Sequence, residues 1–83
     1  MTRDEVYNLI NGERSYQNNL PPHRSDGKDK SVGEYLTMLR HYLNAADSAW
    51  TVNRGDYEAL DNIRKIAGIS VRCMEEHETP PRN

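Results

Sequence analysis

One stretch of the sequence decides the fold: DYEALDNIRKIAGISVRCMEE, residues 56–76. Its apolar residues recur so closely that they cover most of the circumference of an α-helix, and one polar stripe that includes Glu58, Lys65 and Gly68 interrupts them. Such a helix needs apolar partners on two sides, and the chain offers one other long amphipathic helix. We therefore expect copies of the protein to pack together as a homo-oligomer. The expected interface residues are Trp50, Leu60, Ile63, Ile66, Ile69, Cys73 and Met74.

Two capping boxes mark the starts of the other helices. Thr2-Arg3-Asp4-Glu5 and Ser31-Val32-Gly33-Glu34 each place a Glu three residues after a hydroxyl. The first predicts a short helix over about 3–18, which has to end before Pro21-Pro22. The second predicts a helix over about 32–52, whose apolar residues repeat at alternating spacings of three and four.

The run Asn53-Arg54-Gly55-Asp56 predicts a tight break followed by a new N-cap at Asp56. The third helix is then expected over about 56–77, antiparallel to the second in a two-helix hairpin. Residues 19–30 form a polar loop, and the tail 78–83 is not helical. The sequence thus predicts one all-α domain over residues 1–83, made of a short N-terminal helix, a polar loop and a helical hairpin.

Composition excludes several classes of function. The net charge is −2, from 11 Lys and Arg against 13 Asp and Glu, and the signs are interspersed. A general DNA or RNA binder would need a basic face. No apolar run approaches the roughly 18 residues of a membrane span, and the N-terminus is too polar and too acidic for a secretory signal. We expect a cytoplasmic protein in which Cys73 is a small buried apolar residue, without disulfide, cofactor or metal site.

The start of the second helix is a candidate site for a phosphate. Arg24, Lys28, Lys30 and Ser31 converge where unpaired backbone N–H groups and the helix dipole favour an anion. The alternative is an ordinary solvated loop, because Asp26 and Asp29 interleave with the cations.

A second candidate cluster closes the first helix. Tyr16 or Arg14 is suited to stacking on a base, while Gln17 or Glu13 reads the edge of that base. In the alternative, Tyr16 packs on the hairpin, and Glu13 and Arg14 are solvated or paired.

One enzyme class shares an all-α oligomeric architecture with this prediction, the nucleoside triphosphate pyrophosphohydrolases. They hold magnesium with Glu-x-x-Glu on one helix and Glu-x-x-Asp on the next. Glu58 and Asp61 match the second motif, but Glu34 is followed three residues later by Thr37, so the first motif is absent. A magnesium–triphosphate site needs several converging carboxylates. We therefore expect a protein that is not an enzyme, with pyrophosphohydrolase as the third hypothesis.

Four strings resemble a family of small bacteriophage proteins: Gly-Glu-Arg-Ser-Tyr-Gln (12–17), Ser-Val-Gly-Glu-Tyr-Leu (31–36), Ile-Arg-Lys-Ile-Ala (63–67) and Cys-Met-Glu-Glu-His (73–77) with a following Pro-Pro-Arg. The resemblance implies a viral origin, and so the cytoplasm of an infected bacterium. The layout is also similar to phage sponge proteins of the anti-CBASS and anti-Thoeris type, which sequester cyclic-nucleotide signals. In those sponges a Tyr of the N-terminal helix stacks on a base and a loop Lys binds phosphate.

By position, that likeness assigns these roles to Tyr7 or Tyr16 and to Lys28 or Lys30. The leading hypothesis is therefore a homo-oligomer that captures a small nucleotide-type anion without catalysis and serves in phage counter-defence. The alternative is a protein-binding inhibitor or adaptor of a host protein.

Overall fold

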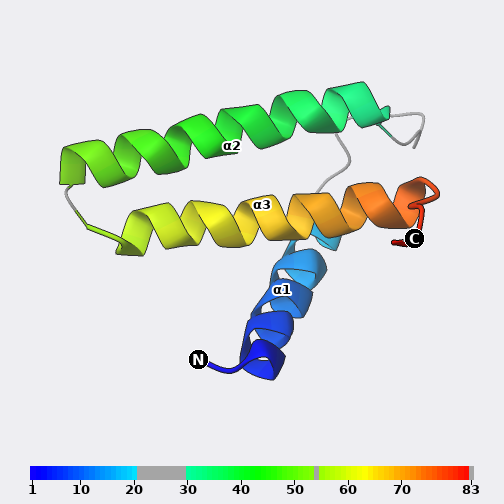
Figure 1. The fold of residues 1–83 in the computed structure, drawn as a ribbon, viewed down its shortest axis with the longest axis horizontal. Coiled ribbons are helices and arrows are strands. Elements are labelled where there is room, and N and C mark those ends of the chain that lie inside the picture. The colour runs from blue at the N-terminus through cyan, green and yellow to red at the C-terminus, as the bar shows by residue number, and fades with distance from the viewer. Residues whose placement is uncertain (21–29, 54, 83) are drawn as a thin grey trace.

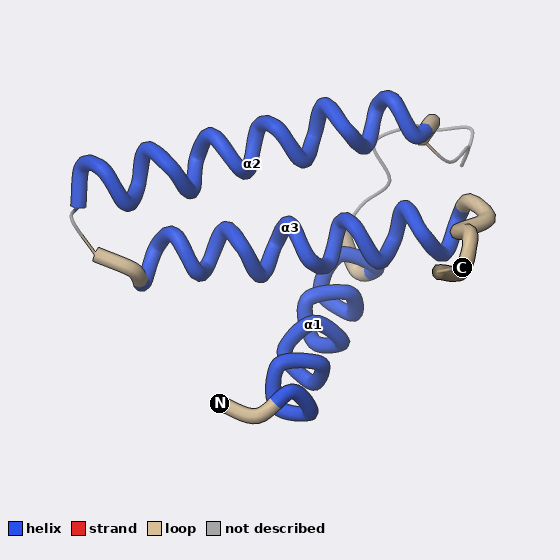
Figure 2. The backbone as a smooth tube through the Cα atoms, in the orientation of Figure 1, coloured by secondary structure: helices blue, strands red, loops and turns tan. Residues whose placement is uncertain are grey.

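The computed structural model describes residues 1–20, 30–53 and 55–82. These residues form three α-helices and no strand (Figure 2). Helix α1 spans Arg3–Asn18, α2 spans Val32–Asn53 and α3 spans Tyr57–Glu76. The expected all-α fold is confirmed, and each helix end lies within one residue of its expected position. Among the described helices, none combines the length and the apolar character that crossing a membrane requires.

Both capping boxes form as expected. The Thr2 hydroxyl accepts a hydrogen bond from the backbone N–H of Glu5 (3.2 Å), and the Glu5 carboxylate accepts one from the N–H of Thr2 (3.3 Å). Ser31 and Glu34 make the same exchange, at 3.1 Å in both directions. These four bonds satisfy backbone donors that the first turn of a helix otherwise leaves unpaired.

The predicted N-cap at Asp56 is at the expected position but does not form the expected hydrogen bond. Asp56 does precede α3, but its side chain makes no capping bond. Its Oδ1 instead accepts a hydrogen bond from the indole N–H of Trp50 (3.2 Å). The carboxylate therefore joins the last part of α2 to the start of α3.

Helices α2 and α3 lie side by side and run in opposite directions (Figure 1). At the other end of the pair from Trp50, the hydroxyl of Tyr35 donates to the carboxylate of Glu76. Nearby, His77 Nε2 lies 2.9 Å from the backbone oxygen of Lys30. Among the described residues, the buried hydrophobic side chains are Tyr35, Ala46, Ala59 and Ile69.

The core corrects one expected interface residue. Ile69 was expected between copies of the protein, but it is buried within the single chain. The reason is its helical position, because Ile69 shares the inner side of α3 with Ala59, ten residues earlier. Ile66 and Cys73 lie between these two residues around the helix and are half-buried.

Helix α1 crosses α3, and among the described residues it packs on α3 and not on α2. Its N-terminal half projects away from the α2–α3 pair (Figure 1). The crossing point is Gly68, where an added Cβ would lie 2.6 Å from Glu13 Cγ and 2.8 Å from Gln17 Nε2. Only a glycine permits so close an approach. The polar stripe of α3 is therefore the surface on which α1 packs.

Candidate ligand-binding site

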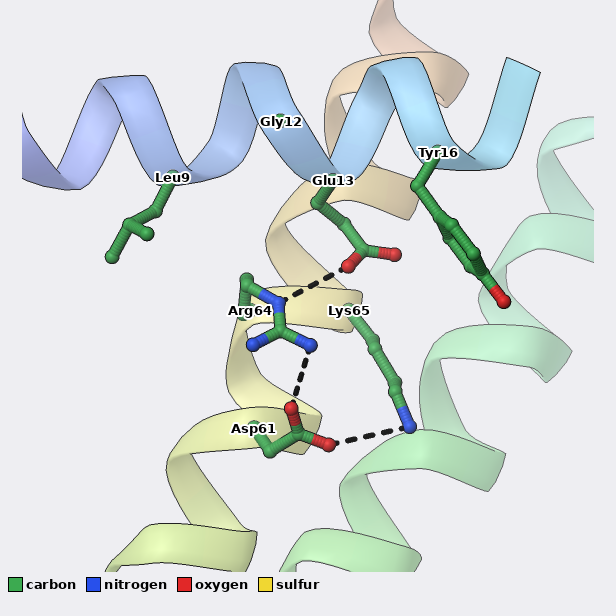
Figure 3. A pocket seen from close by; sticks show the side chains of 7 residues that line it. All are labelled: Leu9, Gly12, Glu13, Tyr16, Asp61, Arg64 and Lys65. Carbon is green, nitrogen blue, oxygen red and sulfur yellow. Dashed lines mark hydrogen bonds and ion pairs between the residues drawn. The ribbon is translucent and has the colours of Figure 1, made fainter. Parts of the chain in front are cut away.

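A hollow of about 510 Å³ opens between α1 and α3 (Figure 3). Both helices line it with residues three or four positions apart, which share one helical face. From α1 come Leu9, Gly12, Glu13 and Tyr16, and from α3 come Asp61, Arg64 and Lys65. The hollow exists because α1 crosses α3 at Gly68 and its N-terminal half then diverges from α3.

A chain of ion pairs crosses this hollow (Figure 3). Arg64 donates from Nε to Glu13 Oε1 (3.1 Å), and its Nη2 lies 2.6 Å from Asp61 Oδ1. Lys65 Nζ lies 3.4 Å from the second oxygen of Asp61. The hydrogen bond to Glu13 raises the pKa of the Arg64 guanidinium. Two cations face two carboxylates, so the lining carries no net charge.

Lys65 is the more available of the two cations. Desolvation raises the pKa of the Asp61 carboxyl. The charges and hydrogen bonds of Arg64 and Lys65 lower it by more, so the net pKa lies below its ordinary value. Asp61 thus stays ionised near neutral pH. The pair that it makes with Lys65 is long and more than one-third exposed on both sides, whereas the Glu13 carboxylate that holds Arg64 is buried. An exposed ion pair of this kind exchanges partners at little cost.

Tyr16 stands at the rim of the hollow and is 62% exposed. Its ring extends from α1 in the direction in which Lys65 extends from α3 (Figure 3). The alternative in which Tyr16 packs on the hairpin is therefore wrong. Tyr7 is also exposed, but it lies nine residues earlier, or about two and a half helical turns, and so projects from the opposite side of α1.

Arg14 and Gln17, expected to contact a base, instead fasten α1 to α3. Arg14 is buried and donates two hydrogen bonds to the Glu75 carboxylate, from Nε (3.2 Å) and Nη2 (3.0 Å). Gln17 donates to Glu13 (2.9 Å) beside Gly68. Both side chains therefore have partners within the chain, because the close crossing turns this part of α1 toward α3. The paired alternative for Glu13 and Arg14 is confirmed.

The expected phosphate site is described only in part, since Arg24 and Lys28 lie outside the described residues. Lys30 is half-buried and Ser31 is used in the capping box. Two N–H groups of this helix start already donate to the box, and the Glu34 carboxylate occupies the positive end of the helix dipole. An anion therefore meets fewer free donors here than the sequence suggests.

The acidic motif on α3 also has other partners. Both oxygens of the Asp61 carboxylate contact cations, Arg64 and Lys65. Within the described part of the chain, no group of three His, Cys, Asp or Glu side chains is close enough to hold one ion.

Comparison with protein-family models, curated proteins and solved structures yields no match. Sequence reasoning identified Tyr16 but missed Arg64 and Lys65 as its neighbours. The spacing of Asp61, Arg64 and Lys65 indicates local ion pairs. Nothing local indicates that α1 lies across them.

Proposed function

We propose that the protein captures a small nucleotide-type anion without catalysis, as a phage counter-defence sponge does, and that it works as a homo-oligomer. The observation that supports the ligand is the position of Tyr16, an exposed aromatic ring at the rim of a hollow that also holds Lys65. An aromatic ring can stack on a nucleotide base, and a cation beside it can pair with the phosphate.

In the proposed complex, the base stacks on Tyr16 and the phosphate replaces Asp61 as the partner of Lys65. The exchange is inexpensive because an exposed ion pair contributes only about 0–1 kcal/mol. Arg64 stays with the buried carboxylate of Glu13 and keeps the hollow in shape. Arg24, Lys28 and Lys30, in the connection between α1 and α2, remain the further proposed phosphate contacts.

The test is native mass spectrometry of the purified protein with cyclic di- and trinucleotides, cyclic ADP-ribose isomers and ordinary nucleotides. We expect one unaltered nucleotide species to bind in a fixed ratio to the protein. Tyr16→Ala should weaken that binding roughly tenfold or more, because base–aromatic stacking contributes about 1–3 kcal/mol. Tyr57→Ala is the matched control, since Tyr57 is also exposed but lies outside the lining of the hollow.

A wild-type protein that ignores the whole pool would refute nucleotide capture. Equal losses in the Tyr16 and Tyr57 variants would refute the site. The double variant Lys28→Ala with Lys30→Ala tests the connection separately: a sponge loses affinity while it stays folded, whereas a protein-binding module need not respond.

The exposed apolar side chains of α2 and α3 favour a second candidate, a module that binds a protein. In that case the hollow is solvated, and the function resides in a surface formed by both helices. If the Tyr16 and lysine variants keep the biological effect of the wild type, that result would support protein binding over nucleotide capture.

A further inference from the structure

Seven large apolar side chains on α2 and α3 remain between 47% and 59% exposed. On α2 they are Val32, Leu36, Leu43 and Trp50, and on α3 they are Leu60, Ile63 and Met74. Single exposed apolar residues are normal on a protein surface, but a contiguous group indicates an interaction site. The question is whether these seven form one surface.

Helical geometry places them on one side of the pair. On α2 the four residues are separated by four or seven positions, so they form one stripe along the helix. This stripe is rotated by about a fifth of a turn from Tyr35 and Ala46, the buried contact residues of α2. On α3 the three residues are rotated in the same sense, by about a third of a turn, from Ala59 and Ile69.

Each stripe is displaced around its helix from the face that contacts the other helix. When two helices are antiparallel, displacements in the same sense place both stripes on the same side of the pair. The two stripes therefore adjoin and form one surface along both helices, which we call the apolar face. Helix α1 does not cover this face, because it contacts α3 through Arg64, Gly68 and Glu75, which lie on a different side of α3. On α3 the charged residues Glu58, Asp61, Lys65 and Arg72 lie on the opposite flank from the stripe. On α2 the exposed Arg40 and Asp47 lie along one edge of the stripe.

The interior of the single chain is small. Its buried hydrophobic residues, among those described, are Tyr35, two alanines and one isoleucine. A domain of this size is marginally stable even with a normal core, and additional burial commonly comes from association. Seven half-exposed large side chains offer several hundred Å² of apolar area, which is of the order of the ~800 Å² per partner in a stable interface.

We infer that the apolar face is the docking surface for a second copy of this chain, with the α2–α3 layers of two copies packed face to face. A two-fold axis brings the same surface of both copies together, so an apolar strip that runs the length of both helices meets its like. Leu36, Leu43 and Trp50 are seven residues apart, so they form one line along α2 that can meet the same line of a second copy. The net charge of only −2 sets up little repulsion between copies.

This surface specifies the homo-oligomer of the proposed function and differs from the expected one. Trp50, Leu60, Ile63 and Met74 remain interface residues, Ile69 does not, and Val32, Leu36 and Leu43 are added. The interface therefore belongs to α2 as much as to α3. It leaves the hollow between α1 and α3 open, so ligand capture and association are separable.

The first experiment measures the molar mass of the purified protein by light scattering, without nucleotide, over a range of concentrations. We expect a dimer or a multiple of it at micromolar concentration, with a melting temperature that rises with concentration. Leu43→Glu should reduce the mass to that of a monomer or lower the melting temperature sharply, since a charge is then buried between copies. Val52→Glu is the matched control, because Val52 is 77% exposed and lies nine residues later, on the opposite side of α2.

A wild-type monomer at every concentration would overturn the inference, as would a Leu43 variant that keeps the wild-type mass. Because the Leu43 variant risks unfolding, a second measurement uses the wild type. Met74 on the apolar face and Met1 outside it are both mostly exposed in a single chain, at 54% and 84%. We expect peroxide to oxidise Met74 at least tenfold more slowly than Met1, and dilution to remove that protection.

Similar oxidation rates for Met74 and Met1 at all concentrations would also overturn it. Association measured without nucleotide tests the apolar face alone. A dimer that ignores nucleotides would leave this inference intact while refuting nucleotide capture, and a monomer that binds them would do the reverse.

Discussion

Helix α3 is held on two sides by different kinds of interaction. Against α2 it buries Ala59 and Ile69 with Tyr35 and Ala46, a small apolar contact. Against α1 it uses ion pairs and a glycine, with Arg64 and Glu75 on either side of Gly68. The neighbouring residues Glu75 and Glu76 show the division most clearly, since Glu75 contacts Arg14 of α1 and Glu76 contacts Tyr35 of α2. Adjacent residues on a helix point in different directions, so one turn of α3 serves both partners.

The difference predicts different responses to the same perturbation. An apolar contact gains its free energy from the area removed from water and responds mainly to changes in volume. A contact made of ion pairs depends on geometry, on protonation and on salt. Breaking either contact alone therefore tests whether α1 and the α2–α3 pair are separate units of stability.

The largest expected effect follows from Ile69→Ala. The substitution removes most of one of the four buried hydrophobic side chains of the described residues, which should lower the free energy of unfolding by about 2–5 kcal/mol. Chemical denaturation followed by circular dichroism measures it. Val52→Ala, at an exposed position of α2, is the control and should change the stability by less than about 0.5 kcal/mol. Equal effects in the two variants would contradict the burial of Ile69.

A smaller and more local effect is expected from Gly68→Leu. A side chain here collides with Glu13 and Gln17, so α1 should leave its place on α3 while α2 and α3 stay together. Overpacking of this kind costs about 1–3 kcal/mol. Amide hydrogen exchange should rise throughout α1 and little elsewhere.

The matched variant for that test is Gly12→Leu, because Gly12 is also helical but has no atom within 4 Å of an added Cβ. It should keep α1 in place and slow its exchange, since leucine favours a helix more than glycine does. If both variants loosen α1 to the same extent, the crossing at Gly68 is not what positions it.

The smallest effect concerns pH. The hydrogen bonds from Arg14 hold the pKa of the Glu75 carboxyl below its ordinary value of 4.5. A carboxyl whose pKa is lowered by folding stabilises the fold above its unfolded pKa, and this contribution disappears as the pH falls through the folded pKa. The contact between α1 and α3 should therefore be constant from about pH 7 to about pH 5 and weaken at lower pH.

Carbon NMR titration of the Glu75 carboxyl measures this shift. In Arg14→Ala, the pKa should return toward its ordinary value, because the cation that lowers it is gone. An unchanged titration in that variant would mean that the Arg14–Glu75 pair does not form in solution.

Local features of the fold followed directly from the sequence. The capping boxes at Thr2 and Ser31 form as expected, because each needs only residues three positions apart. The side-chain cap at Asp56 does not form, because its backbone (φ −89°, ψ −21°) is already helical, whereas an N-cap residue is typically extended. Tyr16 was recognised as a candidate from its neighbours in α1, whereas the opposing cations Arg64 and Lys65 were not.

The sequence by itself predicted helices over about 3–18, 32–52 and 56–77, which differ by at most one residue from those of the structure. Periodicity, caps and helix-breaking residues act within a few positions, so the sequence alone reveals them. It also showed that α3 has more apolar surface than α2 alone covers. Only the tertiary structure decided which side of α3 receives α1. The decisive contact pairs Gly68 with Glu13 and Gln17, about fifty positions away, and depends on the absence of a side chain. A polar stripe and a glycine do not reveal a helix partner, because the ion pairs of that contact arise only once α1 lies across α3.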